Sequence, residues 1–326
     1  MPFIESKRWS STNYRTDNPP VAHPRLGLRL RLRRLSPYEL PQHADLAEHQ
    51  GKTKPADPRA FAREVLDEAE GFATEYWPKN FKVKSSSKSS PPSKANVELV
   101  AYDIDVDDMP PEVRGGAISG VAESWFGRSS VHENKAERGS ADWSEFETFL
   151  LDDHSEHEKD YTPAVYDAHK VMDWGRTTLE GIDGWEKVEM AVFEMCHSLP
   201  SPLNNRVFSV LVVKGRSTRS PLSFVTAQIP VDISRVPVAL YSTGRNREEG
   251  KGEQKKVVTP GIYVSVERAE LLDDGSKVKW QMATASDAKG VLPMWAQKLG
   301  VPGAVVKDVG LFMDWVSLRR ENLTWT

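Results

Sequence analysis

One short polar stretch, LDDHSEHEKDYTPAVYDAH at 151–169, holds three histidines and six carboxylates. Such side chains could bind a metal, catalyse proton transfer, or cap and solvate the end of a helix. His154 and His157 are three residues apart, so they would share one helix face. Other side chains of the stretch could complete the ligand set of a divalent ion: Asp153, Glu158 and His169. The spacing is not the His-Glu-x-x-His of zinc hydrolases. We therefore expect no metal, and interpret the stretch as the polar end of a helix, with a catalytic histidine–carboxylate pair as the alternative.

The overall composition restricts the class of protein. A net charge of −4 and a pI near 6.1 give no general attraction to nucleic acid, so we expect no nucleic-acid partner. Cys196 is the only cysteine, which excludes an internal disulfide and suits a reducing compartment. The first residues contain no continuous apolar run typical of a secretory signal, and no later run is long enough to cross a bilayer. We expect a soluble, cytoplasmic protein.

The amino-terminal part divides into two segments. Residues 1–24 are expected to form a disordered tail, and residues 25–57 a basic arm or edge segment. Five arginines between 25 and 34 alternate with leucines at period two. This pattern favours a solvated edge strand with its leucines turned inward, and the alternative is attraction to anionic lipid head groups.

The rest of the chain, residues 58–321, is expected to form one domain. Proline and apolar spacing predict a helix at 58–77, Asp142 is a plausible N-cap of a second helix at 141–161, and flexible loops are expected at 82–95 and 242–256. Apolar residues at alternating steps of three and four predict a long final helix at 291–318, bent at Pro302. Alternation and turn residues predict eight strands: 97–102, 119–133, 168–176, 185–197, 206–214, 222–230, 262–272 and 277–286.

Strands that follow one another through turns, such as the hairpin DDGS at 273–276, indicate one curved antiparallel sheet. Together with the long final helix, they predict an α+β helix-grip fold, in which the sheet wraps around that helix. The segment YVSVERAELLDDGSKVKWQMATASDAKGVLPMWAQKLGVPGAVVKDVGLFMDW resembles the last two strands and closing helix of START domains, the steroidogenic-acute-regulatory-related lipid-transfer family. In that family a second strand ends near Ser/Thr-Asp and Leu-Pro-x-Trp opens the helix, here the junction from Ser286-Asp287 to Trp295.

Other segments extend this resemblance over residues 119–320. WEKVEMAVFEMCHSLPSPLNNRVFSVLVV is similar to the central strands of START domains. ESWFGRSSVHE and DDHSEHEKDYTP look closest to an uncharacterised START-like branch seen mainly in filamentous fungi. The resemblance implies a tunnel between the sheet and the final helix that holds one sterol, phospholipid or other apolar molecule.

Strand alternation suggests which side chains could line such a tunnel. Arg268 and Glu194 fall on the same faces as apolar residues of their strands, and a buried charge is costly unless paired. We therefore expect them to contact each other or the polar head of a ligand, with Thr226 and Gln228 extending the polar spot, although Arg268 could instead reach water at its strand end. Further expected ligand-binding positions lie on the same elements: Met190, Trp280, Met282, Thr284, Trp295, Val309 and Met313.

The sequence therefore predicts a protein that binds, and transfers or senses, a lipid or other hydrophobic small molecule. Transient contact with an anionic membrane could use the arginines at 25–34 or the basic residues at 242–256. The alternative is a cyclase- or hydrolase-like enzyme in the same cavity, with Glu194 or a cavity histidine as the acid or base. No nucleophile elbow, cofactor loop or complete metal set appears, so we expect no cofactor and favour a binding protein over an enzyme.

Overall fold

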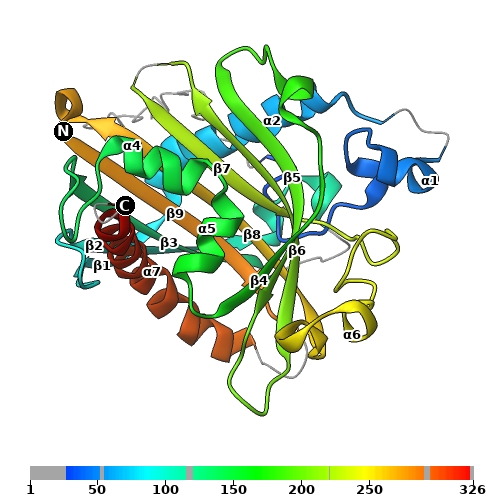
Figure 1. The fold of residues 1–326 in the computed structure, drawn as a ribbon. Helices are drawn as coiled ribbons and strands as arrows, with labels where there is room; N and C mark the ends of the chain where they lie inside the picture. The colour runs from blue at the N-terminus through cyan, green and yellow to red at the C-terminus, as the bar shows by residue number, and fades with distance from the viewer. Residues whose placement is uncertain (1–26, 52–54, 115–119, 220, 290–293, 324–326) are drawn as a thin grey trace, which may run out of the picture.

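The computed structural model describes residues 27–51, 55–114, 120–219, 221–289 and 294–323, and within the last range the side chains of 300–321. The described residues form one sheet in the order β1-β2-β3-β9-β8-β7-β6-β5-β4 (Figure 1). All neighbouring strands are antiparallel, and the first residues of β6 also pair in parallel with the start of β8. The strands are β1 Lys82–Lys88, β2 Val97–Asp105, β3 Val121–Glu133, β4 Val165–Asp173, β5 Trp185–His197, β6 Asn205–Ser217, β7 Ser223–Pro230, β8 Val258–Leu272 and β9 Lys277–Asp287.

Helices cover both faces of this sheet. In Figure 1, α2 lies behind the strands, whereas α4, α5 and α7 lie in front of them. The helices are α1 Ala47–Gln50, α2 Pro58–Gly71, α3 Trp77–Asn80, α4 Trp143–Phe146, α5 His154–Tyr161, α6 Asn246–Glu249 and α7 Met294–Leu323, with π-helical turns at Phe72–Tyr76 and Glu147–Leu151. Short 3-10 turns occur at Pro37–Glu39, Ala44–Leu46, Val106–Asp108, Pro111–Val113, Arg176–Leu179, Gly252–Lys255 and Asp273–Gly275. The α+β helix-grip fold is thereby confirmed, and none of the described helices has the length and apolar character needed to cross a bilayer.

Each face of the sheet has its own apolar core. On one face, α2 contributes Phe61, Val65 and Leu66 to a cluster with inward residues of β5 to β9. The helix begins as its sequence predicts, because Pro58 occupies the first turn and the Asp57 carboxylate accepts the amide N–H of Ala60 at 3.0 Å. On the other face, α7 packs its apolar side against β2, β3 and β9 and against the residues of α4. Both faces of the central strands are therefore buried.

The amino-terminal arm follows the α2 face without forming a strand. Residues 28–33 are a series of bends, and the described arginines turn toward the protein. Arg31 is fully buried and pairs with Glu123 at 3.0 Å, while Arg29 pairs with Glu64 at 3.2 Å. Two further arginines are also engaged: Arg33 with Glu39, and Arg34 with the carbonyl of Gly261. Residues 28–33 do not form the predicted edge strand: internal ion pairs hold them, and Leu35 pairs with Val231 in a single bridge.

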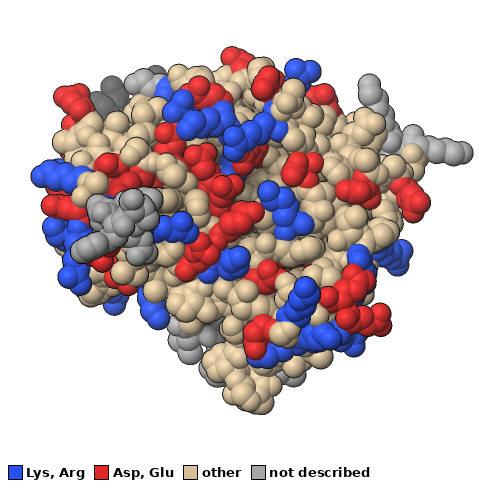
Figure 2. Space-filling view, viewed as in Figure 1, with Lys and Arg blue, Asp and Glu red and all other residues tan. Residues whose placement is uncertain are grey.

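Two predicted loops also differ from the structure. The segment predicted as a loop at 82–95 begins with β1, an exposed edge strand that pairs with β2 through irregular register. The segment at 242–256 contains α6 and a 3-10 turn, and its basic residues are partly neutralised by their neighbours, as in the pairs Arg245–Glu249 and Lys256–Glu253. Figure 2 shows basic and acidic side chains interspersed over this face of the molecule rather than one patch of a single sign.

The helix predicted at 141–161 is interrupted. Asp142 is the N-cap of α4, as expected, and its side chain accepts the amide N–H of Glu145 at 3.0 Å. A π-helical turn follows, and Asp153 then adopts a left-handed conformation with φ of 44° before α5 begins. Because of this break, α5 runs in a new direction and turns its polar side chains toward the sheet.

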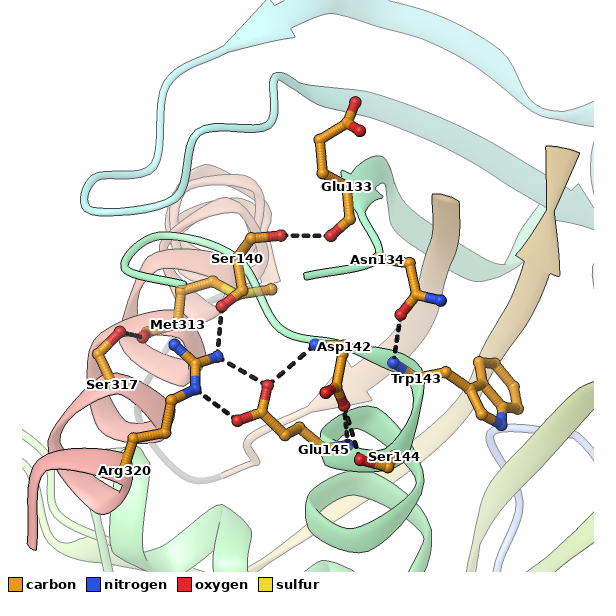
Figure 3. A network of polar contacts seen from close by, with 10 residues as sticks. All are labelled: Glu133, Asn134, Ser140, Asp142, Trp143, Ser144, Glu145, Met313, Ser317 and Arg320. Carbon is orange, nitrogen blue, oxygen red and sulfur yellow. Dashed lines mark hydrogen bonds and ion pairs between the residues drawn. The ribbon is translucent and has the colours of Figure 1, made fainter. Parts of the chain in front are cut away.

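Among the polar contacts that fasten the carboxyl-terminal half of α7, two tie it to Ser90 and to the segment at 140–145. The amide N–H of Gly310 donates to the Ser90 hydroxyl at 2.8 Å, at a close approach of α7 to the turn after β1. Figure 3 shows the second contact, in which the Arg320 guanidinium lies between the Glu145 carboxylate and the carbonyl oxygen of Ser140. The same carboxylate accepts the Asp142 N–H, so the end of α7 is tied to the start of α4.

Candidate functional site: a cavity between the sheet and helices α5 and α7

A cavity of about 400 Å³ lies between the sheet and helices α5 and α7. Its wall comes from α5, α7 and six strands, β3 and β5 to β9. Apolar side chains form much of this wall: Met195, Leu199, Phe208, Met282, Val301 and Val305. A volume of this size falls within the range of small-molecule sites, and the mixture of an apolar wall with a few polar groups is typical of them.

A buried polar cluster lies on the wall of this cavity, centred on Glu267 of β8. Its carboxylate accepts the indole N–H of Trp280 at 2.8 Å and lies 3.4 Å from a guanidinium nitrogen of Arg128. The Arg128 guanidinium also stacks over the Trp280 ring, 3.8 Å from its centroid. Arg128 and Glu267 are therefore an ion pair almost completely removed from water, which is stable only because further contacts fix both groups.

His154 of α5 links this pair to a second carboxylate. Its Nδ1 lies 2.9 Å from the carbonyl oxygen of Leu150, which can only accept, so Nδ1 carries the hydrogen. Its Nε2 lies 3.3 Å from the Gln228 amide nitrogen and 3.8 Å from the carboxylate of Glu158. Gln228 also donates to Glu158 at 3.4 Å. The helix α5 thus brings a neutral imidazole and a carboxylate side by side at the cavity wall.

The cavity shifts the pKa of each of these groups toward its neutral form. Burial raises the pKa of Glu158 to about 8, with further increases from the charges of Glu267 and Asp308. Burial likewise raises the pKa of Asp308 to about 6 and lowers that of His154 to about 4. The pKa of Glu267 is also raised by burial, although the Arg128 charge opposes the shift. At neutral pH, Glu158 is mainly protonated and His154 is uncharged.

Some polar atoms on this wall have no partner within the described part of the chain. Nε and Nη1 of Arg128 and the hydroxyl of Thr226 are buried without a hydrogen bond, and both side chains are 1% exposed. Leaving a buried donor unmatched costs roughly 1 to 3 kcal/mol, more when the group is charged. Because both residues line the cavity, a bound molecule or water can supply the missing acceptor.

Only some of the residues that the sequence predicted as ligand-binding line the cavity. Four of them line the cavity: Thr226, Gln228, Met282 and Thr284. Trp280, Val309 and Met313 are buried in the core beneath it, and Met190 lies in the core on the opposite face of the sheet. The side chain of Trp295 lies outside the described residues.

Arg268 and Glu194 do not meet each other and do not line the cavity. Arg268 faces α2, where its guanidinium pairs with Glu70 at 3.1 Å and with Glu270. The Glu194 carboxylate is fully buried and accepts three backbone N–H groups, from Leu240, Tyr241 and Ser242. The expected contact between the two is wrong, because each already has its partners on the α2 face or in the loop after β7.

The polar stretch at 151–169, in contrast, contributes directly to the cavity. His154, Glu158 and Tyr161 line it, whereas the sequence was interpreted as giving only the polar end of a helix here. The signal was the unusual density of histidine and acid, and the helix break at Asp153 is what turns these residues inward. His157 instead packs against Phe149 and Trp315. Within the described ranges, no group of three or more His, Cys, Asp and Glu side chains could hold a metal ion.

Several of the solved structures that this chain resembles are StAR-related lipid transfer proteins. Human StAR-related lipid transfer protein 5 is 9% identical, with 80% of this chain and 99% of that chain covered at a TM-score of 0.51. Human STARD10 is 12% identical, covering 84% of this chain and 86% of that one at 0.44. A STAR-related lipid transfer protein from Xanthomonas axonopodis is 11% identical, covering 73% and 98% at 0.42. The first similarity shows that the fold is START-like, as the sequence resemblance implied.

Sequence comparison places the chain in a family without placing it near a characterised protein. No curated protein matches the sequence significantly. A family model described as "Protein of unknown function (DUF3074)" matches residues 125–316, which is more than half of the chain and includes most of β3, all of β9 and α5, and the cavity-lining part of α7. The chain therefore belongs to the DUF3074 family, and it carries a START-like helix-grip fold.

Proposed function

We propose that this protein binds a hydrophobic small molecule with a polar head group in the cavity between the sheet and α7, and carries or senses it. The observation that carries the proposal is the cavity itself. Its wall is largely apolar, yet Arg128 and Thr226 leave buried polar atoms without partners on the same wall. An apolar body with one polar end satisfies both parts of such a site.

The energy for binding would come from burial of the apolar part. Each buried CH₂ contributes roughly 0.8 kcal/mol, so a chain of about twelve carbons could gain about 10 kcal/mol before the cost of immobilising it. The polar groups would add orientation more than affinity, because they exchange water for the ligand's head group. The START-like fold supports the proposal, since a solved protein with this fold is named as a lipid transfer protein. The fold alone does not select a sterol, a phospholipid or another apolar molecule.

Two finer aspects of this function are also proposals. Transient contact with an anionic membrane would have to use exposed lysines such as Lys251 and Lys255, because the described arginines of the amino-terminal arm are already engaged within the protein. The carrier would act in the cytoplasm, where its single buried thiol at Cys196 needs no partner.

A second candidate function is favoured by one observation, the contact between His154 and Glu158 in the cavity. A neutral imidazole beside a mainly protonated carboxyl could move a proton to or from a bound substrate, as acid–base enzymes do. This version no longer involves Glu194, which is occupied by backbone N–H groups. Chemical change of the bound molecule during incubation would distinguish an enzyme from a carrier.

The test is to identify what the purified protein holds. Extraction with organic solvent followed by mass spectrometry should give one class of apolar molecule at stoichiometric amount. Val301→Trp, which fills the α7 wall of the cavity, should lose that molecule, whereas Val257→Trp at an exposed position outside the cavity should keep it. If the wild-type protein holds no apolar molecule and takes up none from sterol, phospholipid or fatty-acid vesicles, the proposed function is wrong.

A further inference from the structure

Carboxyl groups outnumber arginines around the cavity. Three carboxylates from different elements line it: Glu158 on α5, Glu267 on β8 and Asp308 on α7. Two arginines also line the cavity, but they have different kinds of partner. Arg206 donates its N–H groups to backbone carbonyls of residues 204, 205, 288 and 289 and forms no ion pair among the described residues. Only Arg128 approaches the carboxylates.

Arg128 pairs with one of the three carboxyl groups and leaves the other two without an arginine partner. Its guanidinium pairs with Glu267 at 3.4 Å. In the described part of the chain, Asp308 has no ion pair, and the only ionisable partner of Glu158 is His154 at 3.8 Å. Burial lowers the pKa of that histidine to about 4, so it carries no positive charge at neutral pH. Glu158 therefore faces the cavity without a counter-charge among the described residues, and Asp308 faces it without an ion pair, although the charges of Arg128 and Lys307 partly oppose the rise of its pKa.

The pKa values of these two carboxyl groups agree with this geometry. Burial raises the pKa of Glu158 to about 8 and that of Asp308 to about 6, and the charge of Asp308 contributes to the first shift. The same cavity wall contains other titratable groups that face these carboxyls: Glu267, Arg128, His154, Tyr161 and Tyr263. A cation placed between the two carboxyl groups would stabilise their ionised forms and lower their pKa values, as a nearby positive charge does for any buried acid.

An independent observation indicates that the head group also contains an oxygen. Arg128, 1% exposed, has two nitrogens, Nε and Nη1, without an acceptor, and the Thr226 hydroxyl is unmatched in the same way. These donors require an oxygen that accepts, and an ammonium group cannot provide one. The two observations thus call for both a donor cation and an acceptor oxygen in one bound molecule.

We propose that the ligand is an apolar amine whose head group also carries an oxygen, such as a long-chain amino alcohol, with its ammonium at Glu158 and Asp308 and its oxygen at Arg128. The inference rests on the proposed function and narrows its ligand class. The ammonium is the element that the cavity lacks, and the rings of Tyr161 and Tyr263 provide further surfaces that favour a cation.

Calorimetric titration with four ligands of equal chain length tests this assignment: dodecylamine, dodecan-1-ol, dodecanoic acid and 2-aminododecan-1-ol. We expect the amine to bind at least about 10-fold more tightly than the alcohol, as a charge-assisted hydrogen bond provides. The amino alcohol should bind more tightly still. Glu158→Gln should abolish the preference for the amine, whereas Glu156→Gln, on the same helix but outside this cavity, should preserve it.

Proton release gives a second readout that a purely structural role of Glu158 would not produce. With a pKa of about 8, Glu158 is about 90% protonated near pH 7, so pairing with an ammonium should release close to one proton per ligand. The release is measured from the dependence of the binding enthalpy on the ionisation enthalpy of the buffer. It should be absent for the alcohol and in Glu158→Gln.

The outcomes separate the inference from the proposed function. If the alcohol or the acid binds as tightly as the amine, or if the amine preference survives in Glu158→Gln, the inference is wrong while the proposed function stands. If the amino alcohol gains nothing over the amine, the assignment of an oxygen to Arg128 is wrong. If none of the four ligands binds, the inference is wrong, and the proposed function fails as well only if the purified protein also holds no apolar molecule and takes up none from vesicles.

Discussion

Replacing Glu158 with Gln should stabilise the protein in a way that depends on pH. The amide matches the shape of the protonated carboxyl and can still accept from Gln228, but it never carries a charge. Glu158 has its pKa raised from 4.5 to about 8 in the folded protein. The stability that this group contributes is therefore fully present below pH 4.5 and is lost as pH rises through the folded value.

The size of the effect follows from the shift. One pKa unit corresponds to about 1.4 kcal/mol, so the wild-type protein should lose about 3 kcal/mol relative to Glu158→Gln near pH 7 and about 5 kcal/mol above pH 8. These are upper values, because a fifth of the Glu158 side chain is exposed and water in the cavity would stabilise its charge. Near pH 4 the two proteins should be equally stable, since both side chains are then neutral in the folded and unfolded states.

Urea unfolding followed by circular dichroism at several pH values measures this difference directly. Glu156→Gln is the matched control, because that side chain is 40% exposed and, among the residues that the structure describes, forms an ion pair with Lys170 alone, at 3.8 Å. Its effect should stay within about 0.5 kcal/mol at every pH. A stability difference for Glu158→Gln that is the same at low and neutral pH, or a variant less stable than wild type at neutral pH, would refute the reasoning.

Two further substitutions test other parts of the structure. Glu194→Gln should destabilise the fold by about 2 kcal/mol or more in urea unfolding, because an amide cannot accept all three N–H groups from the loop after β7. Ligand affinity should not change. A loss of affinity at unchanged stability would instead restore the predicted binding role of Glu194. Gly310→Ala should lower the free energy of unfolding by about 1 to 3 kcal/mol, because the added Cβ would lie 2.4 Å from the carbonyl oxygen of Pro91. Thermal unfolding measures this loss, and an unchanged melting temperature would contradict the close approach.

Most of the sheet could be predicted from the sequence. The strand predicted at 185–197 coincides with β5, and those predicted at 222–230 and 277–286 differ from β7 and β9 by one residue. Alternating side chains and strong turns such as DDGS define these strands locally. β1 was missed because its sequence, KVKSSSK, has no apolar face, and only its pairing with β2 makes it a strand.

The orientation of the strands could not be predicted in the same way. Alternation divides a strand into two faces but does not say which face the final helix covers, and here both faces are buried. Every residue of β7, for example, is buried. Arg268 and Glu194 were therefore assigned to the cavity although they lie on the other side of the sheet, while Thr226 and Gln228 were assigned correctly to the cavity wall. When both faces of a sheet are buried, the face on which a charged residue lies can be predicted only if its partner on the covering helix is known.

The two contacts described for α7 both lie on one side of its cavity-lining segment. Gly310 and Arg320 hold the half of the helix that lies beyond the cavity, whereas the cavity-lining positions run from Gly300 to Asp308. Pro302, within that segment, removes a backbone hydrogen bond and makes the cavity-lining part of α7 easier to bend. The stiffness of this segment would then set how long a ligand stays, while the polar cluster would set which ligand is bound. Residence time and selectivity could thus be changed independently by substitutions in different elements.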